Sequence, residues 1–213
     1  MVAVPERPPW HRGESESGYT LVELVIAAAI MTVVLGGTIM LAMQMQQAYG
    51  TELNDVEVEQ EARYALDWIS RDLRSAGNDP YDVILPNQEV WIDPNGGADP
   101  NDSIRVQADI APPGPDGDIG DPGENVTIAF DPANKVITRQ DSNGANPAAQ
   151  AMTDAIVTDL SFAYLNVGHA PTVVPDQVAY VQVQVKARSR ARNPRTGAFT
   201  ESTLSNEVRL RGR

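Results

Sequence analysis

A long apolar run near the N-terminus is the strongest pattern in this chain. After Glu23 no charged residue occurs until Glu52, and residues from about 21 to 45 are predominantly apolar. About 20 consecutive apolar residues suffice for a helix to cross the hydrocarbon core of a bilayer. The run therefore predicts a membrane-spanning helix over about residues 21–45. Glu23 lies at the edge of this run, where a carboxylate is costly unless something neutralises it, so it is a candidate functional residue.

The pattern after the apolar run remains helical but becomes amphipathic. Acidic side chains dominate between Tyr49 and Glu61, and apolar residues then recur at spacings of three and four. Gly77 and Pro80 follow this stripe and supply signals that end a helix. These features predict one helix over residues 19–76. The stripe consists of Ala62, Ala65, Leu66, Ile69, Leu73 and Ala76.

Residues 77–213 show alternating patterns typical of β-strands, separated by turn-rich loops. The clearest strand runs from Tyr180 to Lys186, where Val and Gln alternate as in a half-buried antiparallel strand. Residues 131–134 predict a hairpin loop. An antiparallel β-sheet packed on the amphipathic half of the helix would bury both apolar faces, which indicates the α+β class. The other predicted strands cover residues 104–108, 126–130, 135–139, 156–164 and 207–211, with Ile156, Thr158, Leu160, Phe162 and Tyr164 on one face and a short helix as the alternative for the start of that strand.

The residues Gly18-Tyr19-Thr20-Leu21-Val22-Glu23-Leu24 precede and open the apolar run. This segment resembles the N-terminal signature of type IV prepilins and pseudopilins. The resemblance implies a leader peptide, residues 1–18, which prepilin peptidase removes by cutting after Gly18. Tyr19 would then become the methylated N-terminus, and Glu23 would pair with the amino terminus of a neighbouring subunit during assembly. It also implies a pilin-like fold, with the long helix over 19–76 packed on a periplasmic or extracellular β-rich domain over 77–213.

Two further stretches, Ala62 to Gly77 and Ser205 to Arg211, resemble the PilW-like minor pilins and the related J-type pseudopilins of type II secretion. This resemblance implies a low-copy subunit that helps to initiate or cap a type IV pilus. Its partners would be other major and minor pilins, contacted through the N-terminal helix, prepilin peptidase, the inner membrane and the pilus assembly platform. The chain would be a single-pass inner-membrane protein with a cytoplasmic N-terminus before assembly, and part of a cell-surface pilus afterwards.

Other interpretations of the N-terminal segment remain open. A plain single-pass anchor needs only the apolar run. A secretory signal peptide fits less well, because the run is longer than its usual apolar core and the preceding residues are not net basic. For the whole chain, the alternatives to a minor pilin are a J-type pseudopilin and a binding or adhesion module at a filament tip.

Composition argues against an enzyme. The chain contains no cysteine, so it can form neither a disulfide nor a thiol nucleophile. Its two histidines are His11, in the predicted leader, and His169, in a predicted loop. No catalytic residues are predicted, and no cofactor is required by the pattern.

Charge is distributed unevenly along the chain. Residues 1–185 carry 8 basic and 27 acidic side chains, whereas residues 186–213 carry 8 basic and 2 acidic ones. The acidic body argues against nucleic acid as a partner, because non-specific affinity comes mainly from neutralising phosphates. The basic end is a candidate interaction patch for an acidic neighbouring subunit, and a simply solvated hairpin is the alternative. The patch consists of Arg188, Arg190, Arg192 and Arg195.

One acidic loop carries a candidate metal site. Four carboxylates fall within nine residues, with glycines between them, and Ca²⁺ prefers several oxygen ligands from such flexible loops. The spacing is not that of an EF-hand, and the same residues are also ordinary turn formers. The hypothesis is a structural Ca²⁺ held by Asp116, Asp118, Asp121 and, as a fourth ligand, Glu124.

Overall fold

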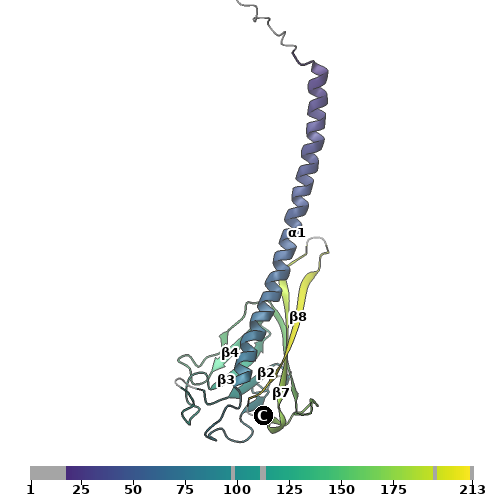
Figure 1. Cartoon of the computed structure of the whole chain (residues 1–213). Helices are drawn as coiled ribbons and strands as arrows, with labels where there is room; N and C mark the ends of the chain where they lie inside the picture. Colours follow the sequence, from purple (N-terminus) through teal and green to yellow (C-terminus); the bar gives the residue numbers. More distant parts are fainter. Residues whose placement is uncertain (1–17, 97–98, 111–113, 194–195, 212–213) are drawn as a thin grey trace, which may run out of the picture. The chain divides into compact units, whose positions relative to one another are not determined.

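The computed structural model describes residues 18–96, 99–110, 114–193 and 196–211. It divides the chain into two compact units, Met1–Ala48 and Tyr49–Arg213, which are described separately below (Figure 1). Apart from Gly18, the predicted leader lies outside the described residues. Helix α1 runs from Leu21 to Ser75 and contributes residues to both units.

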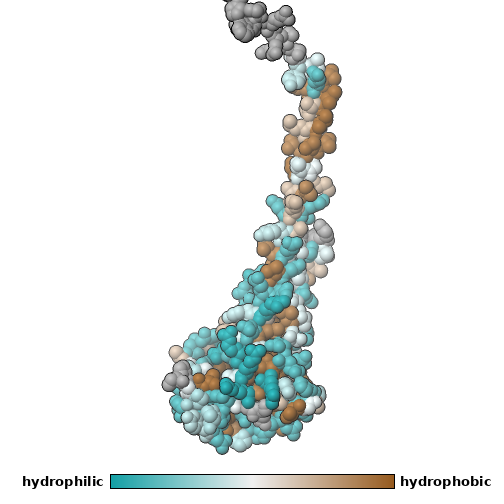
Figure 2. Space-filling view, viewed as in Figure 1, coloured by the Kyte–Doolittle hydropathy of each residue, from teal (hydrophilic) through white to brown (hydrophobic). Residues whose placement is uncertain are grey.

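In the first unit, α1 presents an apolar surface. Every described residue between Gly18 and Ala48 is exposed, and Figure 2 shows mainly hydrophobic side chains along the first part of the helix. Among the described residues, α1 is the one helix long and apolar enough to cross a membrane. Gly36 and Gly37 lie inside α1 without interrupting it. The apolar run is therefore helical, as the sequence predicts.

In the second unit, α1 ends where the sequence signals place its end. Gly77 has a φ of 71°, a left-handed conformation that glycine adopts without strain. Its N–H donates a hydrogen bond to the carbonyl of Gln107 at 2.9 Å. The helix thus stops at Ser75, one residue before the predicted end, and the chain turns directly onto the first β-sheet.

The strands form two antiparallel sheets and not the single sheet that the sequence pattern suggested. The first sheet has the order β1-β2-β3-β4-β5, and the second has the order β6-β7-β8. Strand β5 pairs with the outer edge of β4, so β6 cannot extend the first sheet there. The bounds are β1 Val90–Ile92, β2 Ser103–Gln107, β3 Asn125–Asp131, β4 Val136–Asp141, β5 Gln150–Ala151, β6 Val157–Leu165, β7 Tyr180–Arg192 and β8 Phe199–Arg209, with a short 3₁₀ helix, η1, over Pro175–Gln177.

Several strand predictions are confirmed, and one detail is wrong. The β3–β4 hairpin closes around the predicted loop, with Asp131 opposite Val136. In β6, however, Thr158 is exposed and Val157 is buried, because a bulge between Val157 and Asp159 shifts the register by one residue. The alternative of a short helix at the start of this strand is wrong, because residues 155–156 form a turn.

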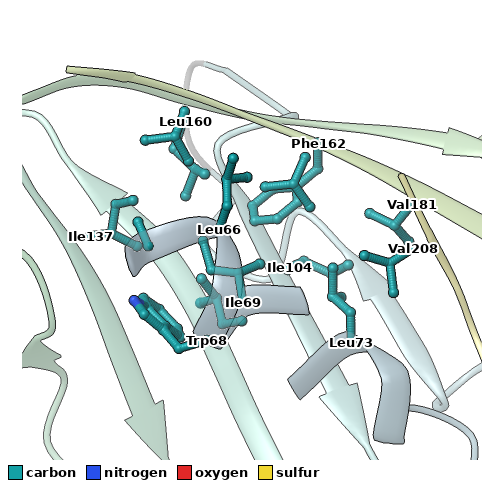
Figure 3. Close-up of a cluster of buried hydrophobic side chains, with 14 of the residues drawn as sticks. Leu66, Trp68, Ile69, Leu73, Ile104, Ile137, Leu160, Phe162, Val181 and Val208 are labelled. Atoms are coloured by element: carbon teal, nitrogen blue, oxygen red, sulfur yellow. The ribbon is translucent and has the colours of Figure 1, made fainter. Parts of the chain in front are cut away.

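The amphipathic stripe of α1 forms the centre of the core, and all six of its predicted members are buried. Figure 3 shows Leu66, Ile69 and Leu73 surrounded by side chains from both sheets. The first sheet contributes residues such as Ile104 and Ile137. The second sheet contributes Leu160, Phe162, Val181 and Val208.

Polar contacts also join α1 to both sheets. Arg139 of β4 forms an ion pair with Asp72 at 2.8 Å, and both side chains are about three-quarters buried. On the other side, the amide of Asn206 in β8 donates to the hydroxyl of Ser70 at 2.8 Å. The second half of the helix is therefore bound to each sheet by apolar packing and by a side-chain hydrogen bond.

Replacing Ile69 by Ala should lower the free energy of unfolding by about 3 kcal/mol, because a fully buried side chain leaves a cavity between the sheets. Tyr64 is 52% exposed on the same helix, so Tyr64→Ala is the matched control and should cost less than about 1 kcal/mol. Denaturant unfolding of the full chain in detergent measures both values. Equal losses for the two variants would contradict the central position of this stripe.

Candidate functional site

The residues of the predicted processing site lie at the start of α1. Gly18 and Tyr19 precede the helix and are exposed, with 89% of the Tyr19 surface accessible. A Cβ atom added to Gly18 would meet no atom of the described residues within 4 Å, its chain neighbours aside. The described part of the chain therefore gives no steric reason for glycine at this position, and a requirement for it would come from the enzyme that cuts there.

Thr20 and Glu23 form a reciprocal set of hydrogen bonds around the first turn. The backbone N–H and the hydroxyl of Thr20 each donate to Oε2 of Glu23 at 2.9 Å. In return, the Glu23 N–H donates to the Thr20 hydroxyl at 3.3 Å. Thr20 also accepts the first helical hydrogen bond, from the N–H of Leu24. This arrangement is a capping box, in which two side chains satisfy backbone donors that the helix leaves unpaired.

The capping box gives Glu23 a role within its own chain. A carboxylate near the N-terminus of a helix is favoured by the helix dipole and here accepts two hydrogen bonds from one residue. Glu23 stands out in the sequence, whereas the role of Thr20 was not predicted. The signal was present in the sequence, because a Thr followed three residues later by Glu, just before an apolar run, is the pattern of this cap.

Two buried carboxylates, those of Asp109 and Glu124, organise the acidic loop. Glu124 was predicted as a calcium ligand, whereas no role was predicted for Asp109. Asp109 accepts hydrogen bonds from the N–H groups of Asp116 and Gly117, each at 3.0 Å. Glu124 accepts hydrogen bonds from the N–H groups of Ile110 and Asp121, each at 2.9 Å. Both acidic residues are fully buried. Their carboxylates therefore hold the backbone of the loop in place.

The other predicted calcium ligands lie in the same loop but are more exposed. Asp116 and Asp118 each accept a backbone N–H two residues further along, as in turns. Among the described residues, no three acidic or histidine side chains are grouped so that they could hold one metal ion. Calcium binding by Asp116, Asp118, Asp121 and Glu124 stays a prediction.

The carboxyl group of Asp121 is perturbed by its surroundings in this loop. Loss of hydration, followed by repulsion from Asp116 and Glu124, raises the pKa of Asp121 above its usual range. Because the folded-state pKa is the higher one, protonation favours the folded chain. The ionised carboxylate thus lowers stability at neutral pH, and this loss is recovered as the pH falls through the folded-state pKa.

The predicted basic patch lies at the end of the β7–β8 hairpin. The guanidinium groups of Arg188 and Arg192 stack on the ring of Phe199, at 4.5 and 4.6 Å from its centroid. Arg190 instead forms ion pairs with Asp154 at 2.7 Å and with Glu57 of α1 at 3.6 Å. Arg195 lies outside the described residues. The three described arginines are thus brought together, although one of them is already paired within the chain.

Thr20→Ala should destabilise the first turn of α1 by about 1 kcal/mol, because the N–H groups of that turn lose their side-chain acceptor. Amide hydrogen exchange over residues 22–24, in the full chain in detergent, should accelerate. Thr20→Ser should restore the slow exchange. Thr32→Ala is the control, because the Thr32 hydroxyl binds the Ala28 carbonyl inside the helix. Unchanged exchange in Thr20→Ala would show that the cap is not formed in the membrane-bound chain.

Asp121→Asn should raise the melting temperature of the full chain at pH 7 and low salt, and the gain should shrink as the pH falls toward 4, about the usual pKa of Asp. Glu52→Gln removes one exposed charge from α1 and is the control.

If the loop binds Ca²⁺, the ion relieves the repulsion between these carboxylates, so it should stabilise the wild type more than Asp121→Asn. Absence of both Ca²⁺ binding heat and a Ca²⁺-dependent shift in the wild type would exclude the calcium site.

Comparison with known proteins gives one match. Residues 15–39 match the family described as the prokaryotic N-terminal methylation motif, a span that includes Gly18, Tyr19, Thr20 and Glu23. No curated protein and no solved structure matches this chain. The chain therefore carries the N-terminal signature of type IV pilins and pseudopilins, on an α+β architecture consistent with a pilin-like fold.

Proposed function

We propose that this protein is a minor pilin, a structural subunit that helps to initiate or cap a type IV pilus. The observation that carries the proposal is the methylation motif over residues 15–39, which includes the first part of a helix long and apolar enough to cross a membrane. Such a motif points to a structural protein and not to an enzyme. In this proposal prepilin peptidase cuts after Gly18, Tyr19 becomes the methylated N-terminus, and the chain is anchored in the inner membrane until assembly.

The capping box suggests how Glu23 would serve this role. Before assembly, the Thr20 hydroxyl and N–H partly compensate the carboxylate. During assembly the methylated amine of a neighbouring subunit would approach the same carboxylate and form an ion pair, which is strong where water is excluded. Thr20 is thus the residue that holds Glu23 near the start of the helix until a partner amine arrives.

The second unit would provide the part of the subunit that faces other proteins. Its core is complete within residues 49–213, and its strands carry polar side chains on their outer faces. This makes it suited to contacts with neighbouring pilins and the assembly platform.

A J-type pseudopilin of type II secretion uses the same processing and is the alternative, as is a binding module at a filament tip. Expression of this chain in strains that lack the subunit distinguishes a minor pilin from a pseudopilin: a minor pilin should restore pili, and a pseudopilin should restore protein secretion.

Co-expression with a prepilin peptidase should yield a mature chain that begins at methylated Tyr19, as read by intact mass and N-terminal sequencing. Glu23→Ala should be cut at the same bond and inserted in the membrane, but it should not enter filaments, because the partner amine has no carboxylate to bind. Glu52→Gln is the matched control, since it removes a carboxylate outside the apolar run.

An uncut chain would favour a plain membrane anchor, and cleavage after the apolar run would indicate a secreted domain. Either result contradicts the proposed function. Normal incorporation of the Glu23→Ala variant into filaments would leave the processing intact but contradict the assembly role of this carboxylate.

A further inference from the structure

A cationic cavity of about 270 Å³ lies in the second unit, where the β3–β4 turn meets the start of β6 and the middle of β7. Its charged lining residues are Lys135, Arg188 and Arg190, and no carboxylate lines it among the described residues. In a chain with a net charge of −13, a concave site of this composition is unusual. The cavity is also lined by Thr158, Ser189 and Phe199.

Backbone hydrogen bonds place two of the cations on either side of one peptide group. The Val157 N–H donates to the carbonyl of Lys135 at 3.1 Å, and the Arg188 N–H donates to the carbonyl of Ile156 at 2.8 Å. Lys135 lies in the turn between β3 and β4 of the first sheet and Arg188 lies in β7 of the second, yet the backbones of both are hydrogen-bonded to the Ile156–Val157 peptide group. These hydrogen bonds fix the two backbone positions relative to each other.

The conformation of Lys135 is itself informative. Lys135 closes the β3–β4 turn with a φ of 58°, a left-handed conformation in which Gly is preferred and Lys is strained. A glycine would satisfy the turn better. The presence of a lysine at such a position is explained if its ammonium group is used, since strained residues concentrate at functional sites.

Neither Lys135 nor Arg188 forms an ion pair with the described residues, whereas Arg190 is bound to Asp154 and Glu57. The carboxylate that lies opposite Arg188 in the β7–β8 register belongs to Glu201, which does not line the cavity. Asp159, on the strand next to Arg188, is bound to Lys186 at 2.7 Å. Stacking of Arg188 on Phe199 orients its guanidinium group and leaves its N–H donors available.

We propose that this cavity binds a phosphate or phosphoester group, with Lys135 and Arg188 as its principal cationic ligands. A tetrahedral oxyanion presents several oxygens in different directions, which matches cations that approach from two sheets, and Arg and Lys are the usual ligands of phosphate. Thr158 lines the same cavity, and its hydroxyl donates to the carbonyl of Lys186 at 3.3 Å. The volume is sufficient for the phosphate group and a small substituent, so either free phosphate or the headgroup of a phospholipid could supply it. The site does not depend on the proposed pilin function.

The test is a titration of the full chain in a maltoside detergent with inorganic phosphate, at constant ionic strength set with chloride, followed by calorimetry and thermal melting. Phosphate should bind and raise the melting temperature. Lys135→Gly and Arg188→Gln should each weaken binding about tenfold, as expected for loss of a charge-assisted contact. Lys135→Gly should melt no lower than the wild type without phosphate, because glycine relieves the strained turn. Arg71→Gln, at an exposed position on α1, should bind phosphate normally.

Equal binding by Lys135→Gly, Arg188→Gln and the wild type would overturn the proposal, as would an effect of phosphate no larger than that of chloride. Titration with acetate and with glycerophosphoglycerol, a soluble headgroup analogue, identifies the ligand class. Tighter binding of the phosphodiester indicates a lipid headgroup, and tighter binding of inorganic phosphate indicates the free anion; both support the site. If acetate binds as tightly as phosphate does, the cavity is a general site for carboxylates and other anions, and this result would also overturn the proposal.

Discussion

Burial of one face of α1, from Val58 to Leu73, determines how the rest of residues 49–213 is arranged. Both sheets turn their apolar faces to this stripe, so the helix forms the middle of a shared core. In each strand every second side chain faces the core. A substitution in the helix stripe would therefore change the packing against both sheets. The ion pair between Arg139 and Asp72 and the hydrogen bond between Asn206 and Ser70 then fix the rotation of the helix, because each meets a different flank of the stripe.

The sequence predicted the elements of the fold more successfully than their arrangement. Helical periodicity and strand alternation are local properties, and they located the buried stripe, the β3–β4 hairpin and the Val positions of β7. Division of the strands into two sheets is a tertiary property, because it depends on β5 occupying the edge of β4. The bulge in β6 was missed for the same reason. Val157 and Thr158 are both good strand residues, and only pairing with β7 decides which of them is buried.

Prediction of functional residues followed a similar division. Glu23 stands out because a charge beside an apolar run has few structural explanations, but its bonds to Thr20 require the geometry of the first turn. In the acidic loop, composition drew attention to the carboxylates, whereas burial separates Asp109 and Glu124, which organise the backbone, from the more exposed members. The proposed phosphate cavity could not be predicted from the sequence. Lys135 and Arg188 are 53 residues apart in the chain and meet only because β6 lies between them.

The far end of the β7–β8 hairpin is held to α1 by polar contacts that are more exposed than those near the core. Thr200 donates to Asp55 at 2.7 Å and Arg190 reaches Glu57 at 3.6 Å, and all four side chains are at least partly exposed. Exposed ion pairs contribute only about 0–1 kcal/mol each and weaken as salt rises. We therefore expect this end of the hairpin to open at a lower free-energy cost than global unfolding, while the core-facing half of the same strands stays closed. Higher ionic strength should favour this opening, because it weakens the ion pair between Arg190 and Glu57.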